Sequence, residues 1–292
     1  MGTGTHRFGE SLQSKVNAMQ SFQHKVAVIT GAGSGIGQQL ALQLARAGAR
    51  LAINDWAEKA LDETTTMCRE LGATVHRSAF SVADREAMYR FAQSVASQYG
   101  QVDLVVNNAG IALIQRKIEA TPYEEFEKII DINLWGVIYG SKAFVPHLKE
   151  RPEAALVNVS SIFGQFAYPN QGPYVTTKFA VKGFTEVLRQ ELAKTSVAVS
   201  VVQPGGIATN IIHNIDTDRT DWRKKFARTF DKMAGTSAEK AAQVILYGVR
   251  RKKKRILIGR DARLADRIIR LFPSSYERIL LRKYDVDRFS QD

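Results

Sequence analysis

Three polar side chains between residues 160 and 178 have a spacing that suits acid–base chemistry. Ser161, Tyr174 and Lys178 stand 13 and then 4 residues apart. A tyrosine and a lysine four residues apart share one face of a helix, and a serine at the end of a neighbouring strand can reach them. A nearby ammonium favours the phenolate and lowers the tyrosine pKa from its usual value of about 10. We therefore expect Tyr174 to exchange a proton with an alcohol or carbonyl oxygen, while Ser161 polarises that oxygen and Lys178 tunes Tyr174.

A glycine-rich segment near the N-terminus has the features of a phosphate-binding turn. Residues 30–37 read TGAGSGIG, after the strand-like KVAVIT and before the helical QQLALQLARAG. Glycines let the backbone approach a pyrophosphate closely, and the helix N-terminus offers free N–H groups. Asp55 follows 18 residues after Gly37. Its carboxylate can accept bonds from an adenosine ribose but would repel a 2′-phosphate, so NAD is favoured over NADP. The alternatives are a purely structural turn and an exposed turn aspartate.

Seven short apolar runs alternate with helical patterns along the chain. Continuous apolar strands separated by helices indicate a parallel sheet covered on both faces. We predict an α/β fold with one doubly wound Rossmann domain, a seven-stranded parallel sheet and a C-terminal helical extension. The expected strands are 24–30, 49–55, 73–80, 102–110, 154–161, 197–206 and 255–259.

The domain organisation follows from this pattern. We predict a flexible N-terminal tail at 1–22, a catalytic domain at 23–260 and a basic helical extension at 261–292. Residues 207–236 are polar with scattered aromatics and are expected to form a lid over the substrate. The chain has no apolar run of about 18 residues, and its first residues have no apolar signal-peptide core, so neither a membrane span nor a secretory signal is expected.

The positive charge is concentrated in the C-terminal segment. The chain carries a formal charge of +12, and residues 249–292 contribute 14 Lys/Arg against 6 Asp/Glu. This distribution argues against a protein that binds nucleic acid over its whole surface, although the run at 250–255 could contact nucleic acid. The run 250–255 and the helical pattern after it fit a solvated edge, docking on the body or a second subunit, or peripheral contact with an anionic membrane. In that helix we expect Leu264, Ile268 and Leu271 on one face and Arg263, Arg267 and Arg270 on the other.

The ordered set of motifs resembles the short-chain dehydrogenase/reductase family. It comprises residues 30–37, Asn107–Gly110, Asn133, Ser161, Tyr174 with Lys178, and Pro204–Gly205, and the resemblance extends over roughly residues 23–260. It implies an NAD(P)(H)-dependent oxidoreductase that interconverts an alcohol and its carbonyl, with Tyr174 as general acid/base and Lys178 on the nicotinamide ribose. The resemblance also implies that Asn133 supports the lysine through an ordered water. A buried asparagine that satisfies a kinked backbone is the alternative.

The same resemblance implies the cofactor contacts and the assembly. Ser81 is a departure, since the family usually has aspartate there, facing the adenine amino group. Helices over 122–149 and 172–194 pack between subunits in relatives, so a homodimer or homotetramer is expected. The implied cofactor-binding residues are Gly31, Ser34, Gly35, Ile36, Gly37, Asp55, Ser81, Val82, Asn108, Ala109, Gly110, Tyr174, Lys178, Pro204, Gly205, Ile207 and Thr209.

The substrate is expected to be apolar, such as a fatty, steroid-like or retinoid-like alcohol. Phe163, Phe166, Tyr168 and residues 111–114 should flank it, unless these side chains are ordinary core. A cofactor-sensing protein or a membrane-surface adaptor on the same fold is the alternative function. Such a protein would be free to lose Tyr174 or Lys178, and the chain keeps both.

The remaining reactive residue types indicate no further chemistry. The single cysteine, Cys68, excludes an intrachain disulfide and favours a reducing, cytoplasmic location. We expect it to be an inert thiol on a surface helix. The five histidines have no metal-ligand spacing, so no metal site is predicted.

Overall fold

A seven-stranded parallel sheet forms the centre of the structure. The computed structural model describes residues 19, 21–114, 116–209 and 235–280. The strand order is β3-β2-β1-β4-β5-β6-β9, and every pairing is parallel. All seven predicted strands are therefore confirmed, as is the doubly wound Rossmann fold. Their bounds are β1 Val26–Thr30, β2 Arg50–Asp55, β3 Val75–Ala79, β4 Leu104–Asn107, β5 Ala154–Val159, β6 Val197–Pro204 and β9 Arg255–Ile258.

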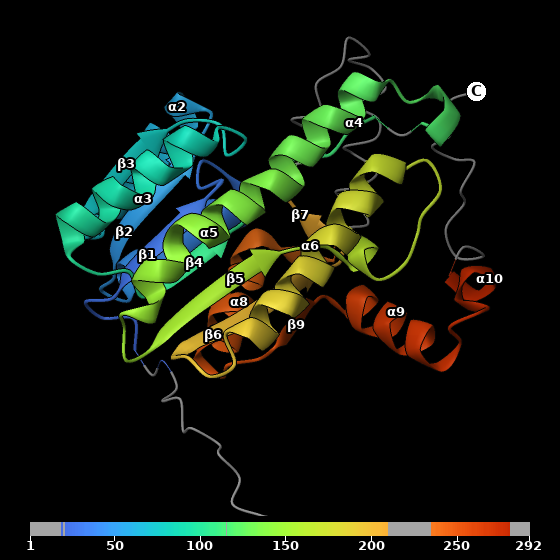
Figure 1. The fold of residues 1–292 in the computed structure, drawn as a ribbon. Coiled ribbons are helices and arrows are strands. Elements are labelled where there is room, and N and C mark those ends of the chain that lie inside the picture. The colour runs from blue at the N-terminus through green and yellow to red at the C-terminus, as the bar shows by residue number, and fades with distance from the viewer. Residues whose placement is uncertain (1–18, 20, 115, 210–234, 281–292) are drawn as a thin grey trace, which may run out of the picture.

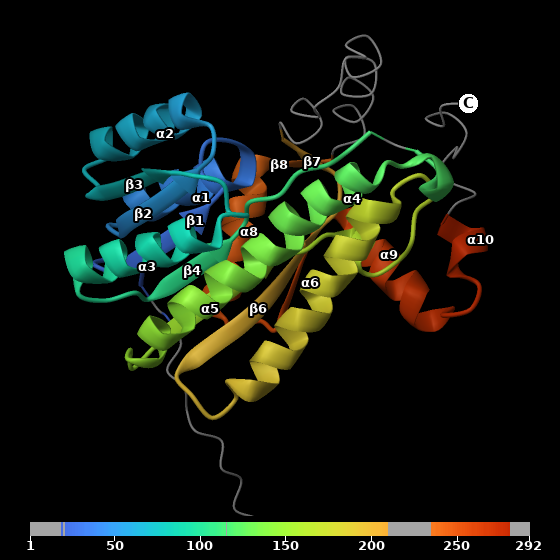
Figure 2. The same ribbon diagram turned by 45° about the horizontal axis from the view of Figure 1, so that its top comes forward.

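Helices cover both faces of this sheet (Figures 1 and 2). One face carries α3 (Arg85–Tyr99), α5 (Gly136–Lys149) and α6 (Gly172–Glu191), whereas the other carries α1 (Gly35–Arg46), α2 (Glu58–Glu70) and α8 (Ala238–Arg250). The central strands are buried on both sides, which is why their sequences are continuously apolar. Helix α4 (Tyr123–Ile130) continues into α5 through the π-helical turn η2 (Asp131–Trp135).

Cys68 does not lie on the surface, contrary to the prediction. It points from α2 into the core between the helices and the sheet, where its exposed fraction is zero. Burial raises the pKa of the Cys68 thiol to about 11. The raised pKa disfavours the nucleophilic thiolate, so the structure gives a different reason for expecting an unreactive thiol.

The C-terminal extension consists of α9 (Arg260–Leu271) and α10 (Tyr276–Leu280), which follow β9. The predicted apolar face of α9 is wrong for Leu264 and Leu271, which are 48% and 72% exposed, whereas Ile268 is partly buried and packs on the body. Ala262 and Ala265 are buried instead and pack near the 3₁₀ turn η3 (Ile162–Gly164). Small side chains at these positions let the helix approach the body closely, which turns the two leucines outward.

The predicted lid is described only at its two ends. Strand β7 (Ile207–Ala208) pairs in parallel with β8 (Thr236–Ser237), two short elements that the sequence did not indicate. Residues 210–234 lie outside the described residues, as do 1–18, 20 and 281–292, so the lid, the N-terminal tail and the end of the extension stay predictions. Among the helices that are described, none is long and apolar enough to span a membrane.

Candidate active site

The candidate site lies where the sheet's strands end. Ser161 follows β5 after one residue, and Tyr174 and Lys178 occupy the first two turns of α6. The glycine turn follows β1, and the segment from Asn108 follows β4. Carboxyl ends of parallel strands meet at one edge of a sheet, which is the usual ligand-binding edge of this architecture.

The structure brings Ser161, Tyr174 and Lys178 together. The Tyr174 hydroxyl lies beside the Ser161 side chain, which acts to lower the Tyr174 pKa. Lys178 Nζ lies 5.5 Å from the centroid of the Tyr174 ring and donates a hydrogen bond to the Val159 carbonyl at 3.3 Å. Ser160 Oγ donates to the main-chain carbonyl of Lys178 at 2.7 Å, which fixes this part of α6 to the end of β5.

Burial dominates the protonation behaviour of this cluster. Lys178 is only 3% exposed, and its burial lowers its pKa from 10.5 to about 8. Burial also raises the pKa of Tyr174, while Ser161 acts in the opposite direction. The sequence predicted a lowered pKa for this phenol. The structure gives the opposite direction, because the loss of hydration outweighs the lowering effect of Ser161.

Asn133 lies beside Lys178, but its side-chain amide is hydrogen-bonded to the main chain. It is buried in the π-helical turn η2. Its Oδ1 accepts a hydrogen bond from the Ile111 N–H at 2.8 Å, and its Nδ2 donates to the Ile111 carbonyl at 3.0 Å. A Cβ built on Gly110 would lie 3.1 Å from Asn133 Oδ1 and 3.3 Å from Lys178 Nζ, so all three are neighbours. These contacts agree with the backbone-satisfying alternative, and they also place the asparagine next to the lysine.

The glycine turn has the close packing that a phosphate cradle requires. Gly31 has a φ of +67°, and a Cβ there would meet the Ala109 Cα at 2.8 Å. A Cβ on Gly37 would collide with the Gly31 carbonyl oxygen. Thr30 Oγ1 accepts hydrogen bonds from the N–H groups of Asn108 and Ala109, which joins the turn to the segment after β4. Only glycine fits these positions, and the residues present therefore fit a bound dinucleotide.

The start of α1 is free to bind an anion. Its N-cap residue, Ser34, makes no side-chain capping bond, and the first turn contains no acidic residue. Gly35, with a φ of +55°, faces Thr209, whose Cβ would lie 3.3 Å from an added Cβ. Thr209 follows the Pro204–Gly205 segment. The structure thus brings this predicted phosphate-binding residue to the helix N-terminus.

Asp55 belongs to the glycine turn rather than to a free loop. Its Oδ2 accepts a hydrogen bond from the Gly33 N–H at 2.8 Å, and its Oδ1 accepts one from the Ala57 N–H at 2.9 Å. The carboxylate is therefore held at the end of β2, next to the turn. The following residue, Trp56, is 75% exposed.

The other predicted cofactor residues are distributed around this edge. Ser81 is exposed in the turn after β3, and Val82 is buried against Gly136, so their described contacts do not reach the glycine turn. Within the described part of the chain, no group of three or more His, Cys, Asp or Glu side chains could hold a metal ion. Ile36 lies in the first turn of α1, Asn108 donates to the Thr30 and Gly31 carbonyls, and Pro204, Gly205 and Ile207 follow one another after β6.

Comparison with known proteins agrees with this geometry. The family model for the short chain dehydrogenase matches residues 25–220. The putative oxidoreductase SadH of Mycobacterium tuberculosis is 42% identical over 265 residues, covering 90% of this chain and 96% of SadH. The chain belongs to the short-chain dehydrogenase/reductase family. It is accordingly an oxidoreductase of that family with a Rossmann nucleotide-binding fold, and NAD(P) is the cofactor typical of the family.

Two solved structures illustrate the range of cofactors in the family. A short-chain dehydrogenase/reductase from Burkholderia phymatum in complex with NAD is 26% identical, with a TM-score of 0.77 over 86% of this chain and 96% of that one. An alcohol dehydrogenase from Thermococcus sibiricus complexed with 5-hydroxy-NADP is 27% identical, with a TM-score of 0.70 over 81% and 96%. The family relationship alone therefore leaves the choice between NAD and NADP open.

A set of buried, hydrogen-bonded side chains supports helix α6 and was missed in the sequence. Asn107 Nδ2 donates to Asn158 Oδ1 at 2.8 Å, and Asn158 Nδ2 donates to Thr185 Oγ1 at 3.1 Å. These hydrogen bonds link β4, β5 and α6. Ser141 Oγ on α5 also accepts a hydrogen bond from Asn107 Nδ2, at 3.1 Å. The available signal was an asparagine in each of two otherwise apolar strands, since buried amides need partners.

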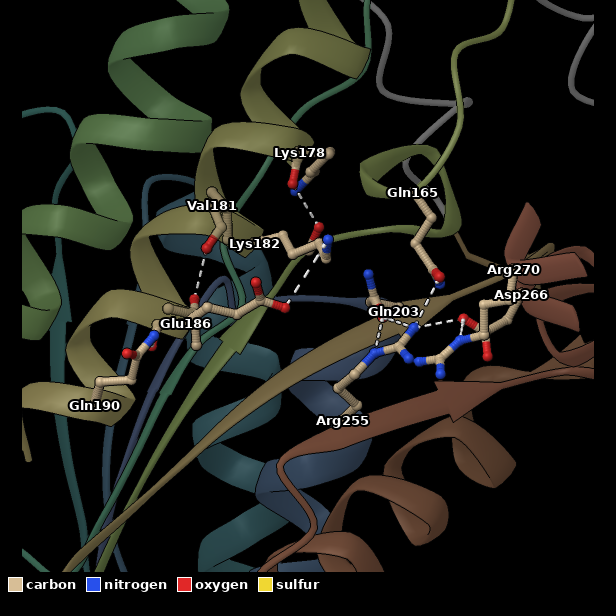
Figure 3. Close-up of polar contacts among 12 residues, drawn as sticks. Gln165, Lys178, Val181, Lys182, Glu186, Gln190, Gln203, Arg255, Asp266 and Arg270 are labelled. Carbon is tan, nitrogen blue, oxygen red and sulfur yellow. Dashed lines mark hydrogen bonds and ion pairs between the residues drawn. The ribbon is translucent and has the colours of Figure 1, made fainter. Parts of the chain in front are cut away.

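A second missed feature is the junction at Arg255, which Figure 3 shows. The Arg255 guanidinium donates to Gln203 Oε1 on β6, to Gln165 Oε1 just after η3, and to Asp266 Oδ1 on α9 at 2.6 Å. Arg270 donates to the same Asp266 oxygen at 3.2 Å. One side chain therefore joins the segment after Ser161, the strand before Pro204 and the C-terminal extension.

Aromatic rings continue from Tyr174 to the C-terminal extension. Phe163 stands edge-on to Tyr174, with centroids 6.3 Å apart, and it also contacts Phe166 at 5.3 Å and Tyr168 at 5.4 Å. Phe166 in turn contacts Tyr276 of α10 at 6.4 Å. Three of the predicted lining residues, Phe163, Phe166 and Tyr168, thus form a connected apolar wall beside Tyr174, with α10 as its outer part. Phe166 belongs at the same time to a buried core cluster with α9, as the core alternative expects.

Because Lys178 is buried, we expect its replacement to change the stability of the protein in a pH-dependent way. A Lys178→Met variant of the cofactor-free protein should be more stable than the unmodified protein at pH 7, by about 1–3 kcal/mol, because it no longer buries a charge. The lysine pKa is 10.5 in the unfolded chain and about 8 in the folded one. Between these values the unfolded chain binds more protons, so the stability of the unmodified protein rises with pH.

The advantage of the variant should therefore shrink from pH 8 to pH 10.5 and disappear above that range. Urea unfolding at a series of pH values measures it. Lys182→Met is the matched control, because Lys182 lies one turn further along α6 and is partly exposed beside Glu186. A difference for Lys178→Met that is independent of pH would contradict the assignment.

Proposed function

We propose that this chain is an NAD-dependent dehydrogenase that interconverts an apolar alcohol and its carbonyl, with Tyr174 as the general acid/base. The supporting observation is the cluster itself. The ring centroid of Tyr174, whose hydroxyl lies beside Ser161, is 5.5 Å from the buried Lys178 amine. Both lie at the strand edge that also carries the glycine turn.

The proposed proton chemistry uses this chain's own side chains. Bound NAD supplies the hydride acceptor or donor. In the reductive direction the Tyr174 hydroxyl donates its proton to the carbonyl oxygen, and in the oxidative direction the phenolate accepts the alcohol proton. Ser161 hydrogen-bonds the same substrate oxygen, and the Lys178 ammonium favours the phenolate and would hold the cofactor ribose. Asn133 keeps the main chain at Ile111 in place beside the lysine.

The preference for NAD is inferred from Asp55. Its carboxylate is fixed against Gly33 and Ala57 at the end of β2, where the adenosine ribose of a bound dinucleotide would lie. A 2′-phosphate at this place would meet a negative charge, and the next residue is an exposed tryptophan rather than a cation.

An apolar substrate is inferred from the wall beside Tyr174. Phe163, Phe166 and Tyr168 pack on one another there, and Ile114 from the opposite segment is buried. The related alcohol dehydrogenase supports an alcohol as the substrate class.

Replacing Tyr174 tests the mechanism. Tyr174→Phe should lower kcat by about 10²–10⁴-fold, because general acid–base catalysis contributes this much, and should leave NADH binding intact. A screen of short polar, aromatic and long-chain alcohols first identifies a substrate. NADH fluorescence titration then separates binding from turnover. Tyr247→Phe, an exposed tyrosine on α8, is the control.

Full turnover by Tyr174→Phe would refute the proposed mechanism. NADH binding with no turnover of any alcohol or carbonyl would instead favour a cofactor-sensing protein. A marked preference for sugars would refute only the apolar substrate.

Replacing Asp55 tests the cofactor preference. The unmodified protein should bind NADH more tightly than NADPH, and Asp55→Ala should reduce that preference by about tenfold or more, because one repelled charge near a phosphate is worth about 1.4 kcal/mol. Parallel fluorescence titrations with NADH and NADPH measure both affinities. Asp62→Ala on the neighbouring α2 removes an acid that is bound to Arg77 and should leave the ratio unchanged. Tighter NADPH binding by the unmodified protein would contradict the proposal.

The proposal includes a homodimer or homotetramer formed through η2, α5 and α6. Trp135, Phe179 and Val187 on these elements are 43%, 41% and 55% exposed, although large apolar side chains are usually covered. We expect sedimentation velocity to show a dimer or tetramer, and a Phe179→Glu/Val187→Glu variant to shift towards monomer. Met67→Glu, at an equally exposed position on α2, should not. A monomer at micromolar concentration would contradict this part.

A further inference from the structure

The outer face of helix α9 combines arginines with exposed leucines. Arg260, Arg263, Arg267 and Arg270 are all exposed, and so are Leu264 and Leu271. Their spacing of three, four and seven residues places these six side chains on one side of the helix, which we call the α9 outer face. The opposite side carries Ala262, Ala265 and Ile269 and packs on the body.

The acidic residues of α9 are directed towards the body instead. Asp261 Oδ2 accepts a hydrogen bond from the Gly206 N–H at 2.7 Å, and Asp266 accepts from Arg255 at 2.6 Å. Asp266 also contacts Arg270, so Arg270 is partly neutralised. Arg263 and Arg267 have no acidic partner among the described residues. The helix therefore separates its charges, and an excess of positive charge faces outward.

The two basic parts of the C-terminal segment lie at opposite ends of strand β9. The turn around residues 251–254 precedes β9, whereas α9 follows it. In a parallel sheet the end of β9 lies at the edge that carries Ser161 and Tyr174. Figures 1 and 2 both show α9 and α10 at that side of the body, outside the helical layers. Of these two basic parts, α9 is the one that lies on the same side as the candidate active site.

We propose that the α9 outer face binds the surface of an anionic lipid bilayer. Guanidinium groups match the geometry of lipid phosphates and carboxylates, and exposed leucines between them can insert at the boundary of the acyl chains. Phe272, at the end of the helix, is 48% exposed and extends the apolar strip. A soluble anion or a nucleic acid would use the arginines but would leave the leucines in water, so the mixed face favours lipid.

The turn at 251–254 lacks this combination. Tyr247 is the exposed apolar side chain next to it, and the charged ends of Arg251 and Lys253 lie over its ring at 5.7 Å and 5.0 Å. The turn thus presents mainly charge, with the neighbouring Tyr247 ring engaged by two of its cations, and it serves as an internal comparison for α9. The binding surface does not depend on the proposed enzymatic function. If both hold, the bilayer lies beside the aromatic wall, because the inner side of α9 packs near Ile162 and Phe166.

The test is sedimentation of the full chain with phosphatidylcholine vesicles, with and without phosphatidylserine. The unmodified protein should bind only the vesicles that contain phosphatidylserine, and high salt should weaken binding because the surface attraction is screened. Arg263→Glu/Arg267→Glu should weaken binding at least about tenfold, since each basic side chain near an anionic surface contributes several-fold. Leu264→Gln/Leu271→Gln should weaken binding while keeping the charge.

Arg250→Glu/Lys254→Glu is the matched control, because it makes the same charge change at two exposed residues of the other edge. It should retain most of the binding. The proposal is overturned if the unmodified protein does not sediment with anionic vesicles, if the α9 variants bind as well as it does, or if the control loses binding to the same extent. NADH titration of each variant reports on the cofactor site separately, so a failure here is distinct from a failure of the proposed function.

Discussion

The burial of the Lys178 amine is the constraint on which the rest of the site depends. A lysine that is 3% exposed loses most of its hydration, and its one described hydrogen bond is to the Val159 carbonyl. Such a position is stable only if the surrounding backbone is held rigidly. The fold supplies that rigidity through Ser160, which anchors the lysine's own carbonyl, and through Asn133, which fixes the main chain at Ile111.

The hydrogen bonds from Asn107 through Asn158 to Thr185 also hold α6 in place, further along the helix. They pair amides inside an otherwise apolar sheet, where an unpaired amide would cost about 1–3 kcal/mol. These hydrogen bonds join α6 to β4 and β5 and so help to fix the position of the helix on the sheet. The C-terminal extension acts similarly from outside, through Asp261 at Gly206 and through Asp266, which binds Arg255 where that arginine meets Gln165 and Gln203.

Features governed by local sequence could be predicted, whereas features governed by contacts between distant segments could not. The strands followed from apolar runs, and the place of Asp55 at the end of β2 followed from its position after the second of these runs. The buried face of α9 was predicted wrongly because leucines are more apolar than alanines and were therefore expected inside. In the structure Ala262 and Ala265 pack on the body. Arg255 looked like part of a solvated basic run, and only the fold brings Gln165 and Asp266 to it. Cys68 was misplaced because Thr64 and Thr65 share its buried side of α2 and hide the apolar pattern.

The two pKa directions in the site have a consequence for the direction of proton transfer. Burial raises the pKa of Tyr174, which keeps the phenol protonated and ready to donate, as reduction of a carbonyl requires. Oxidation of an alcohol requires the phenolate, and a positive charge nearby must then offset the lost hydration. Lys178 supplies that charge only while it is protonated, and its pKa of about 8 lies close to neutral pH. Its charge is lost as the pH rises through that value, while the phenol itself ionises more readily at higher pH. The two groups therefore oppose one another, and the oxidative activity of this site depends on how strongly the amine retains its proton.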